Sequence, residues 1–377
     1  MKTTSFIIFL TMSTITFSLA NAAEPLRFFV GTYTSPDGSR GIYTGQFDAE
    51  RGMLEEPTLA AECGNPAFLA VHPSKPLLYA VGETQQGRLR AFQYDKKNGK
   101  LTPIEDKAIP GQGPCHLTIC LSGNGQTAAV VVANYGSGSV ASFPILDDGK
   151  IGNAASHIVH TGSGPNASRQ RAPHAHGVYF DGSVIAVPDL GIDQVVFYKI
   201  NLETAELFPI PETNLRLAPG AGPRHLAISK DNRFIYVVNE LDSTVSVFDR
   251  QSTEISKPVQ TVSTLDEGKD AAALRNTTAE IELHSSGKFL YASNRGDDSI
   301  AVFAVENGKL TLIQTVPSGG NVPRFFCLDP TGRFLLACNQ NTGNICVFAV
   351  DQTTGKLTPT DQSVNVARPV CLVFALE

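Results

Sequence analysis

The chain lacks the signals of several large protein classes. Its 377 residues contain no tryptophan and no CxxC pair, and 30 basic residues against 36 acidic ones give a net charge of -6. An acidic balance provides no basic surface for nucleic acid, so we expect no nucleic-acid partner. A glycine-rich phosphate loop, a GxSxG nucleophile elbow and an HExxH zinc motif are also missing from the sequence. Nucleotide-dependent enzymes, serine hydrolases with that elbow and HExxH metalloproteases are therefore disfavoured.

Long apolar runs are scarce, and the one at the start has the features of a targeting segment. Lys2 gives a positive beginning, residues 5–19 are largely apolar, and Ala20-Asn21-Ala22 is a small-residue cleavage pattern. We expect a signal peptide over residues 1–22, cleaved after Ala22, and a single domain over residues 23–377. The apolar stretch is too short to span a membrane as a helix. The mature protein is therefore expected to be periplasmic or secreted, without a membrane partner.

Seven cysteines remain in the mature chain, an odd number. Most lie within apolar runs, where a thiol packs like a small hydrophobic side chain. Cys338 and Cys346 flank one predicted hairpin and could face each other, so the sequence leaves their oxidation state open. The pattern does not match the disulfide framework of small secreted domains.

One pattern of short apolar runs is repeated about seven times along the chain. Each copy starts with a proline turn and an apolar run, continues with a second run that ends in Asn or an equivalent, and finishes with a third run that ends in Phe or Tyr. Two copies begin at Gly222-Pro223-Arg224-His225 and at Val322-Pro323-Arg324-Phe325. Short β-branched and aromatic runs bounded by Gly, Asn, Asp and Pro predict strands. Helical periodicity is almost absent.

The repeats also predict how the ends of the chain meet. After the signal segment the chain begins at a second-strand motif, residues 28–33, and it ends with an unpaired inner-strand motif, residues 368–374. The last strand should therefore complete the first unit and close a ring, which leaves few exposed edges. We predict an all-β, seven-bladed β-propeller of four-stranded antiparallel blades. A parallel β-helix would need shorter repeats. The predicted inner strands start at Pro66, Pro114, Pro173, Pro223, Ala279, Pro323 and Pro369.

A closed ring gathers polar residues at one mouth of its central channel, where inner strands begin and second strands end. The densest segment there is Arg171-Ala172-Pro173-His174-Ala175-His176. On one strand, His174 and His176 would point to the same side, which suits a general base with an oriented partner. Packing at a blade junction and metal ligation are the alternatives. Because no other His/Asp cluster has matching spacing, we expect no metal and no cofactor.

Other residues of the predicted mouth carry charge or amide groups. Arg224, Arg295 and Arg324 offer paired donors to a carboxylate, a phosphate or a developing oxyanion, or could form salt bridges between blades. Glu240 and Glu280 could act as bases or hold those arginines. Asn134 and Asn294, which end second strands, are candidate substrate-binding residues.

Several of these motifs together resemble the seven-bladed lactonase family, which includes propeller-type 6-phosphogluconolactonases and fungal carboxymuconate-lactonising cycloisomerases. The resemblance implies that His176, Arg224, Glu240 and Arg295 carry chemistry, that His174 and Arg324 bind an anionic ligand, and that no metal is obligatory. The motifs are Val30-Gly31-Thr32-Tyr33-Thr34, Gly113-Pro114-Cys115-His116, Pro173-His174-Ala175-His176, Gly222-Pro223-Arg224-His225 and Ser293-Asn294-Arg295-Gly296.

By this resemblance we expect a 6-phosphogluconolactonase-like lactonase, a carboxylic ester hydrolase. His176 would activate water, Arg224 or Arg295 would stabilise the oxyanion, and the substrate would be a small, anionic lactone. An exported enzyme does not meet a phosphorylated cytoplasmic substrate, so a non-phosphorylated sugar lactone is also open. A carboxymuconate-type cycloisomerase and a non-catalytic binding platform are the alternatives, although the lack of tryptophan and the His- and Arg-rich mouth argue against a platform. The sequence does not indicate the oligomeric state.

Overall fold

The computed structural model describes residues 24–125 and 128–376, and the expected signal peptide lies outside these residues. Almost all regular structure in this part of the chain is β-strand, together with a short 3₁₀ helix, η1 (Pro211–Thr213). No helix within the described ranges has the length and apolar character needed to cross a membrane.

Seven antiparallel sheets follow one another along the chain, and we number these blades from the N-terminus. The first blade contains β1 (Leu26–Thr32), β2 (Gly41–Asp48), β3 (Met53–Leu54), β4 (Thr58–Glu62) and the last strand, β30 (Pro369–Phe374). The second contains β5 (Pro66–Val71), β6 (Leu77–Gly82), β7 (Arg88–Tyr94) and β8 (Leu101–Ala108). The third contains β9 (Pro114–Leu121), β10 (Ala128–Asn134), β11 (Ser139–Ile145) and β12 (Ser156–Val159).

The remaining blades repeat this order. The fourth contains β13 (Tyr179–Phe180), β14 (Val184–Asp189), β15 (Gln194–Ile200), β16 (Leu207–Pro209) and β17 (Leu215–Arg216). The fifth contains β18 (Pro223–Ile228), β19 (Phe234–Asn239), β20 (Thr244–Asp249) and β21 (Gln260–Ser263). The sixth contains β22 (Thr277–Leu283), β23 (Phe289–Arg295), β24 (Ser299–Glu306) and β25 (Lys309–Pro317), and the seventh contains β26 (Pro323–Leu328), β27 (Phe334–Asn339), β28 (Asn344–Val350) and β29 (Leu357–Asn365).

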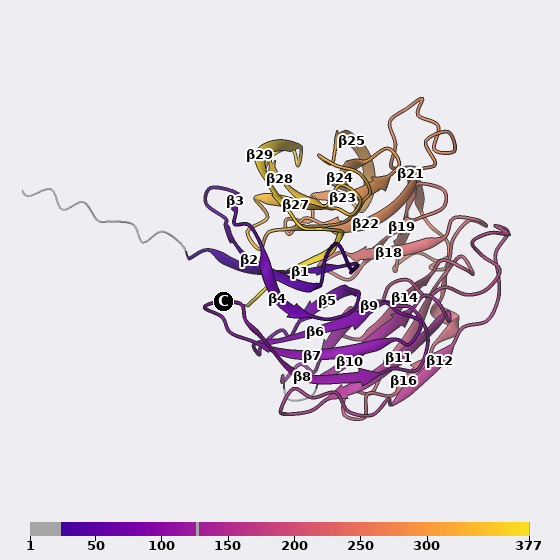
Figure 1. Ribbon diagram of the computed structural model, residues 1–377. Coiled ribbons are helices and arrows are strands. Elements are labelled where there is room, and N and C mark those ends of the chain that lie inside the picture. The colour runs from indigo at the N-terminus through magenta and orange to yellow at the C-terminus, as the bar shows by residue number, and fades with distance from the viewer. Residues whose placement is uncertain (1–23, 126–127, 377) are drawn as a thin grey trace, which may run out of the picture.

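The predicted ring closure is confirmed. β30 pairs with β1 in antiparallel register, with Phe28 opposite Phe374 and Val30 opposite Leu372. The inner strands of neighbouring blades contact one another and surround a central channel. The contacts join β5 with β9, β18 with β22, β22 with β26 and β26 with β30. In Figure 1 the indigo strands of the first blade lie between the yellow strands of the seventh and the purple strands of the second. The seven-bladed β-propeller is thus the observed fold.

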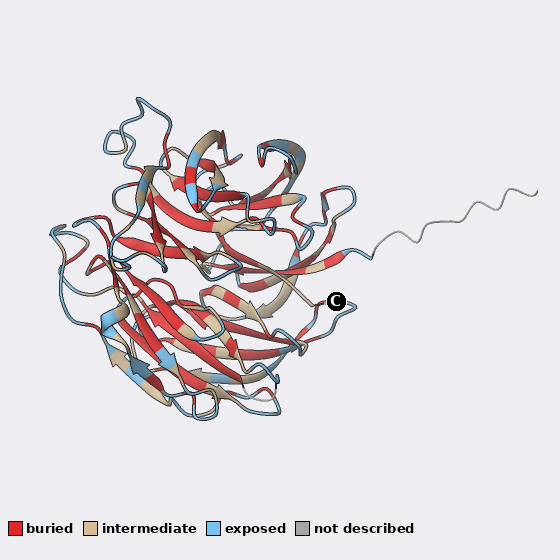
Figure 2. Cartoon of the chain, turned by 180° about the vertical axis from the view of Figure 1, so that it is seen from behind, coloured by how far each residue is buried: buried red, intermediate tan, exposed pale blue. Residues whose placement is uncertain are grey.

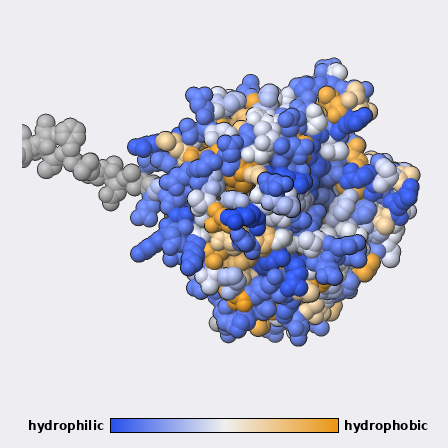
Figure 3. Space-filling view, viewed as in Figure 1, coloured by the Kyte–Doolittle hydropathy of each residue, from blue (hydrophilic) through white to orange (hydrophobic). Residues whose placement is uncertain are grey.

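The core lies between adjacent blades as well as within them. The cluster around Phe28 includes Leu69 of the second blade, Leu336 of the seventh and Leu372 of β30. Strand interiors are buried and the loops at the edges are exposed (Figure 2). The face seen in Figure 3 is mostly hydrophilic, and its apolar side chains form small, separate groups. Each blade therefore depends on its neighbours for burial, as expected for a repeat that cannot cover its own faces.

Most inner strands begin with a β-bulge, an extra residue that is left out of the pairing. In the fifth blade Pro223 pairs with Asn239 and His225 with Val238, which leaves Arg224 unpaired. The seventh blade leaves out Arg324 in the same way, and the third leaves out Cys115. Bulges bend the strand and redirect a side chain, and they are common beside active sites. Here they bring one residue from each of several blades to the channel mouth.

The fourth blade corrects the predicted start of its inner strand. Ala175, and not Pro173, forms the first bridge, to Asp189, and the next pair is Tyr179 with Ala186. Between these two pairs, the inner strand has three residues (176–178) and its partner has only two (187–188). The inner strand therefore contains one extra residue, and His176 occupies this bulge position. His174 and His176 do not lie on a regular strand as predicted, because Pro188 has no N–H to offer the ladder.

The sixth blade needs a smaller correction of the same kind, since Thr278, one residue before Ala279, pairs with Asn294.

The register of β27 and β28 shows whether Cys338 and Cys346 face each other across the hairpin. Cys338 lies opposite Ile345, and Cys346 lies opposite Ala337. Directly opposed residues share a face of the sheet and adjacent positions alternate, so the two thiols point to opposite faces. All seven cysteines are free.

Replacing Leu372 with Ala tests the closing strand. The side chain is 1% exposed, so its loss should lower the free energy of unfolding by about 2–5 kcal/mol. Phe208→Ala is the matched control, because Phe208 is 51% exposed and its loss should change stability by less than about 0.5 kcal/mol. Urea titration measures both, and equal midpoints for L372A and wild type would contradict the pairing of β30.

Candidate active site

One cavity of about 280 Å³ lies where the strand ends of several blades converge. Glu83, Tyr135 and Glu240 each directly follow a second strand, whereas Arg295 is the last residue of one. His176 and Arg324 come from bulges at the start of inner strands. The structure therefore brings together four of the residues predicted for the site from widely separated parts of the sequence. The lining residues are Glu83, Tyr135, Arg169, His176, Glu240, Thr277, Arg295 and Arg324.

Glu240 is the centre of this arrangement. Its Oε1 accepts a hydrogen bond from Arg169 Nη2 at 2.6 Å. Its Oε2 lies 3.1 Å from Arg224 Nε and 3.0 Å from Arg295 Nη2. The carboxylate is almost completely buried. Three guanidinium groups on one carboxylate leave an excess of positive charge, which favours an anionic ligand.

Oε2 of Glu240 is buried and interacts with two arginines by charge. Arg224 and Arg295 are within ion-pair distance of this oxygen, but neither forms an aligned hydrogen bond with it among the described residues. Arg224 Nη1 instead donates to the carbonyl of Ala279 at 2.7 Å, and Arg295 Nη2 donates to that of Thr278 at 2.7 Å. Oε2 therefore balances the two arginines through its charge and not through an aligned hydrogen bond.

The charges at this centre persist at neutral pH. Burial alone would raise the pKa of Glu240, but Arg295, Arg224 and Arg169 outweigh it and lower the pKa to about 2. Burial lowers the pKa of Arg295 to about 10, against the attraction of Glu240, so this guanidinium stays cationic.

His176 meets the requirements of a general base. Its Nε2 lies 3.8 Å from Glu240 Oε2, and its Nδ1 lies 3.8 Å from the thiol of Cys115. Burial, with Arg224 and then His225, holds the pKa of His176 well below its ordinary 6.5. The imidazole is therefore neutral at pH 7, and a water in the cavity beside His176 would face a proton acceptor.

His174 acts one layer behind the cavity. Its Nδ1 donates to the carbonyl of Tyr135 at 2.8 Å, and its ring stacks on the Tyr135 ring with centroids 4.5 Å apart. Its backbone N–H donates to Asp189 Oδ1 at 2.7 Å. His174 does not line the cavity itself, so its contact with the site runs through Tyr135.

Arg324 differs from the other arginines of the cavity. Its guanidinium lies 5.3 Å from the ring centroid of Tyr33, whose hydroxyl donates to Glu83 Oε2 at 2.5 Å. Among the described residues, Arg324 forms no side-chain hydrogen bond and no ion pair within 4 Å. Its donors are thus available to a ligand.

Asn134 and Asn294 do not belong to the cavity, contrary to the prediction. Both are fully buried. Asn134 Nδ2 donates to the carbonyl of Pro110 and to Ser139 Oγ, and Asn294 Nδ2 donates to the carbonyl of Thr264. Because both carbonyls lie in segments that connect one blade to the next, these asparagines fix the connections that enter their own blades.

Sequence reasoning missed Arg169. This arginine lies in the segment that precedes the fourth blade, outside the repeat, and its Nη2 also donates to Tyr135 Oη at 3.1 Å. The basic pair Arg169 and Arg171 beside the histidine motif was the available signal. Arg171, which the motif did include, is exposed and bonds the carbonyl of Ala167. Within the described ranges, no group of three or more His, Cys, Asp or Glu side chains could hold a metal ion.

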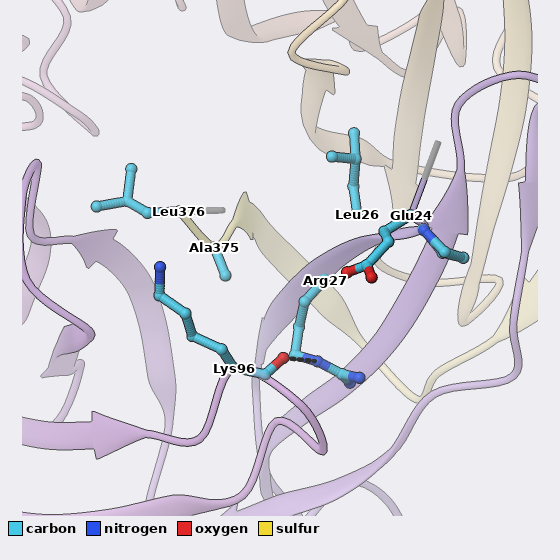
Figure 4. A pocket seen from close by; sticks show the side chains of 7 residues that line it. Glu24, Leu26, Arg27, Lys96, Ala375 and Leu376 are labelled. Carbon is cyan, nitrogen blue, oxygen red and sulfur yellow. Dashed lines mark hydrogen bonds between the residues drawn. The ribbon is translucent and has the colours of Figure 1, made fainter. Parts of the chain in front are cut away.

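A larger cavity, of about 510 Å³, lies where the first and last described residues meet the turn before β8 (Figure 4). Arg27 and Lys96 are the cations that line it. The Nε and Nη2 of Arg27 donate to the carbonyls of Lys96 and Lys97. The residues that line it, Glu24, Pro25, Leu26, Arg27, Lys96, Ala375 and Leu376, include no imidazole. This cavity therefore offers no neutral base.

Comparison with known proteins identifies the class. The model of the seven-bladed β-propeller lactonase family matches residues 27–374, and the chain belongs to this family. The chain is thus a lactonase of the 6-phosphogluconolactonase-like type, an enzyme that acts on cyclic esters.

Individual relatives are similar over almost their whole length. The 6-phosphogluconolactonase of Bacillus subtilis (strain 168) is 38% identical over 352 residues, 92% of this chain and 97% of the relative. The 6-phosphogluconolactonase of Formosa agariphila is 32% identical and covers 90% of this chain and 96% of its own. The structure of the periplasmic gluconolactonase of Pseudomonas aeruginosa superposes with a TM-score of 0.85 at 31% identity, over 94% of this chain and 99% of that one.

Glu240→Gln tests the role of the central carboxylate. Loss of its charge leaves buried guanidinium groups without a counterion, so the free energy of unfolding should fall by about 3–5 kcal/mol. Asp106→Asn removes a half-exposed partner of Arg88 and should cost less than about 1 kcal/mol. Since the pKa of Glu240 is lowered from 4.5 to about 2, its contribution in the wild type is present above pH 4.5 and is lost as the pH falls toward 2. Equal stability of E240Q and D106N would contradict this account.

Proposed function

We propose that the protein hydrolyses a small, anionic sugar lactone, with water activated by His176. The observation that carries the proposal is the neutral imidazole of His176 beside Glu240, in a cavity that also contains the uncommitted guanidinium of Arg324. The names of the Bacillus and Pseudomonas relatives support a gluconolactone-type substrate. A cavity of about 280 Å³ is at the lower end of ligand sites, which suits a single sugar ring.

The proposed first step is attack of water on the lactone carbonyl. His176 takes one proton from the water as the oxygen bonds to the carbonyl carbon, and Glu240 holds the resulting imidazolium by its charge. The carbonyl oxygen becomes an oxyanion, which the guanidinium of Arg295 stabilises from the cavity wall. Arg324 binds the carboxylate, phosphate or hydroxyl groups at the far side of the sugar.

In the second step the tetrahedral intermediate collapses. The bond between the carbonyl carbon and the ring oxygen breaks, and His176 returns a proton to the leaving alkoxide. The product is a hydroxy acid. Arg224 is 2% exposed and does not line the cavity, so we assign it to positioning Glu240 and not to the oxyanion.

We further propose that the enzyme works outside the cytoplasm. The predicted signal segment, residues 1–22, and the periplasmic relative from Pseudomonas aeruginosa support an exported protein. A sugar lactone that carries a carboxylate in place of a phosphate is the anionic substrate that fits such a location.

Three variants test these assignments. His176→Ala and Arg295→Ala should each lower kcat by about 10²–10³-fold. Arg324→Met should instead raise KM for an anionic lactone by about 10- to 100-fold. The measurement is pH-stat titration with glucono- and phosphogluconolactones and with carboxymuconate, in the presence and absence of a chelator. We expect lactone hydrolysis that survives the chelator. Turnover of carboxymuconate alone would favour a cycloisomerase, and wild-type rates in H176A would disprove the assigned base.

The pH dependence follows from the neutral state of His176. A base works only when unprotonated, and the pKa of His176 is held well below 6.5 by burial and neighbouring cations. The value of kcat/KM should therefore stay constant as the pH falls from 7 through 6.5 and decline only at more acid pH. An acid limb centred at or above pH 6.5 would show that another group is the base.

A further inference from the structure

One carboxylate of the cavity, that of Glu83, has no role in the proposed mechanism. The groups assigned to the reaction come from the fourth, fifth and sixth blades. Glu83 directly follows β6 of the second blade, Arg324 belongs to β26 of the seventh, and Tyr33 directly follows β1 of the first. In a ring of seven blades these three lie across the channel from the fourth and fifth. Glu83 therefore belongs to the side of the cavity that faces the reacting groups.

The Glu83 carboxylate has one oxygen in use and one free. Its Oε2 accepts a hydrogen bond from the hydroxyl of Tyr33 at 2.5 Å. Its Oε1 has no hydrogen-bond partner within the described ranges, and the residue is only half-buried. Glu83 lines the same cavity as Arg324, but the two form no ion pair within 4 Å in the described part of the chain. Oε1 is thus open to a ligand.

The backbone around Glu83 is held in place by Asn65. The N–H of Glu83 donates to the carbonyl of Asn65 at 3.0 Å, and Asn65 Nδ2 donates to the carbonyl of Glu83 at 3.2 Å. Asn65 Oδ1 also accepts a hydrogen bond from the N–H of Thr34 at 2.9 Å. Because Thr34 is the next residue after Tyr33, Asn65 connects the two segments whose side chains meet. The free oxygen is therefore in a fixed position before a ligand binds.

Tyr33 lies between the carboxylate and the guanidinium. Its hydroxyl bonds Glu83, and its ring faces Arg324 with the guanidinium carbon 5.3 Å from the ring centroid. Burial raises the pKa of Tyr33, so the hydroxyl keeps its proton and remains a donor to Glu83. Burial alone would lower the pKa of Arg324, but Tyr33 and Glu83 outweigh it and raise the pKa above its ordinary value. A hydrogen-bond acceptor and a permanent cation therefore lie close together without a direct bond between them.

This pair of groups selects a particular ligand chemistry. A guanidinium only donates hydrogen bonds and an ionised carboxylate only accepts them, so the arginines of the cavity can bind an anion but cannot accept a bond from a hydroxyl group. Glu240 is the other lining carboxylate, but its Oε1 is used by Arg169 and its Oε2 is buried. Glu83 Oε1 is therefore the free carboxylate oxygen among the described lining residues. The ligand that satisfies both groups has a hydroxyl beside an anion.

We propose that Glu83 determines specificity by accepting a hydrogen bond from a hydroxyl group next to the anionic group of the lactone, while Arg324 binds the anion. This inference rests on the proposed function and narrows its substrate class from anionic lactones to hydroxylated ones. Hydrogen bonds from a hydroxyl to a charged acceptor are stronger than those between neutral groups. A lactone with a carboxylate but no hydroxyl leaves Oε1 of Glu83 without a donor and places like charges near each other, so it is disfavoured.

Glu83→Leu removes the acceptor, and a matched pair of lactones measures the effect. The γ-lactone of glucaric acid carries a carboxylate and several hydroxyl groups, and γ-carboxybutyrolactone has the same ring and carboxylate without hydroxyls. We expect E83L to lower kcat/KM for glucarolactone by about 10- to 100-fold and not to lower that for carboxybutyrolactone. Glu83→Gln keeps an acceptor oxygen without the charge, so its loss should be smaller. Asp106→Asn is the control variant, because Asp106 is a half-exposed carboxylate of the same blade, and it should leave both rates unchanged.

Binding of the ring-opened acids gives a second readout that needs no turnover. Glucarate and adipate have the same carbon chain and the same two carboxylates, and only glucarate carries hydroxyl groups. Titration calorimetry should show that wild type binds glucarate more tightly than adipate. E83L should weaken glucarate binding by about 10-fold or more without weakening adipate binding, which removes the preference.

Equal losses on both lactones and on both acids would overturn the proposal, because that is the result expected if Glu83 only holds Tyr33 and Arg324 in place. An E83L variant that keeps the wild-type preference for glucarolactone and glucarate would also overturn it, as would a wild type that binds the two acids equally. Failure of the wild type to open any lactone would instead overturn the proposed function, and the comparison of glucarate with adipate would still decide the role of Glu83.

Discussion

The buried carboxylate of Glu240 is the interaction on which the site depends. Three guanidinium groups lie within 3.1 Å of its oxygens. Without an anion between them, cations packed this closely in a buried place would repel one another strongly. Glu240 thus allows a cluster of arginines to remain charged and fixed while one of its oxygens still faces His176. The cavity beside Glu240 is cationic and ordered at the same time for this reason.

The β-bulges turn a repeated scaffold into a specific site. The residue after the opening proline is Arg224 in the fifth blade and Arg324 in the seventh, and both are unpaired by the bulge. In the fourth blade the same position is taken by His176. The backbone geometry is shared, so the chemistry at the mouth depends on which side chain each blade supplies. Ring closure by β30 keeps these positions on one circle.

The fold could be predicted almost completely from the sequence, because the repeats determine both the strands and the closure. The predicted meeting of His176, Glu240, Arg295 and Arg324 followed from strand ends that point to one mouth. The start of the fourth inner strand could not be predicted correctly, since Pro173 imitates the opening proline of other blades while Pro188 interrupts the ladder. Asn134 was misassigned because position alone does not say whether an amide bonds a loop or a ligand. Arg169 lies outside the repeat, so no register placed it near Glu240.

The most direct test is a crystal structure with a non-hydrolysable lactam analogue of gluconolactone that carries a carboxylate. The account predicts the lactam carbonyl within hydrogen-bonding distance of Arg295, its carbonyl carbon facing a water on His176, and the carboxylate on Arg324. A ligand bound at another cavity, or one whose carbonyl points away from both His176 and Arg295, would contradict it.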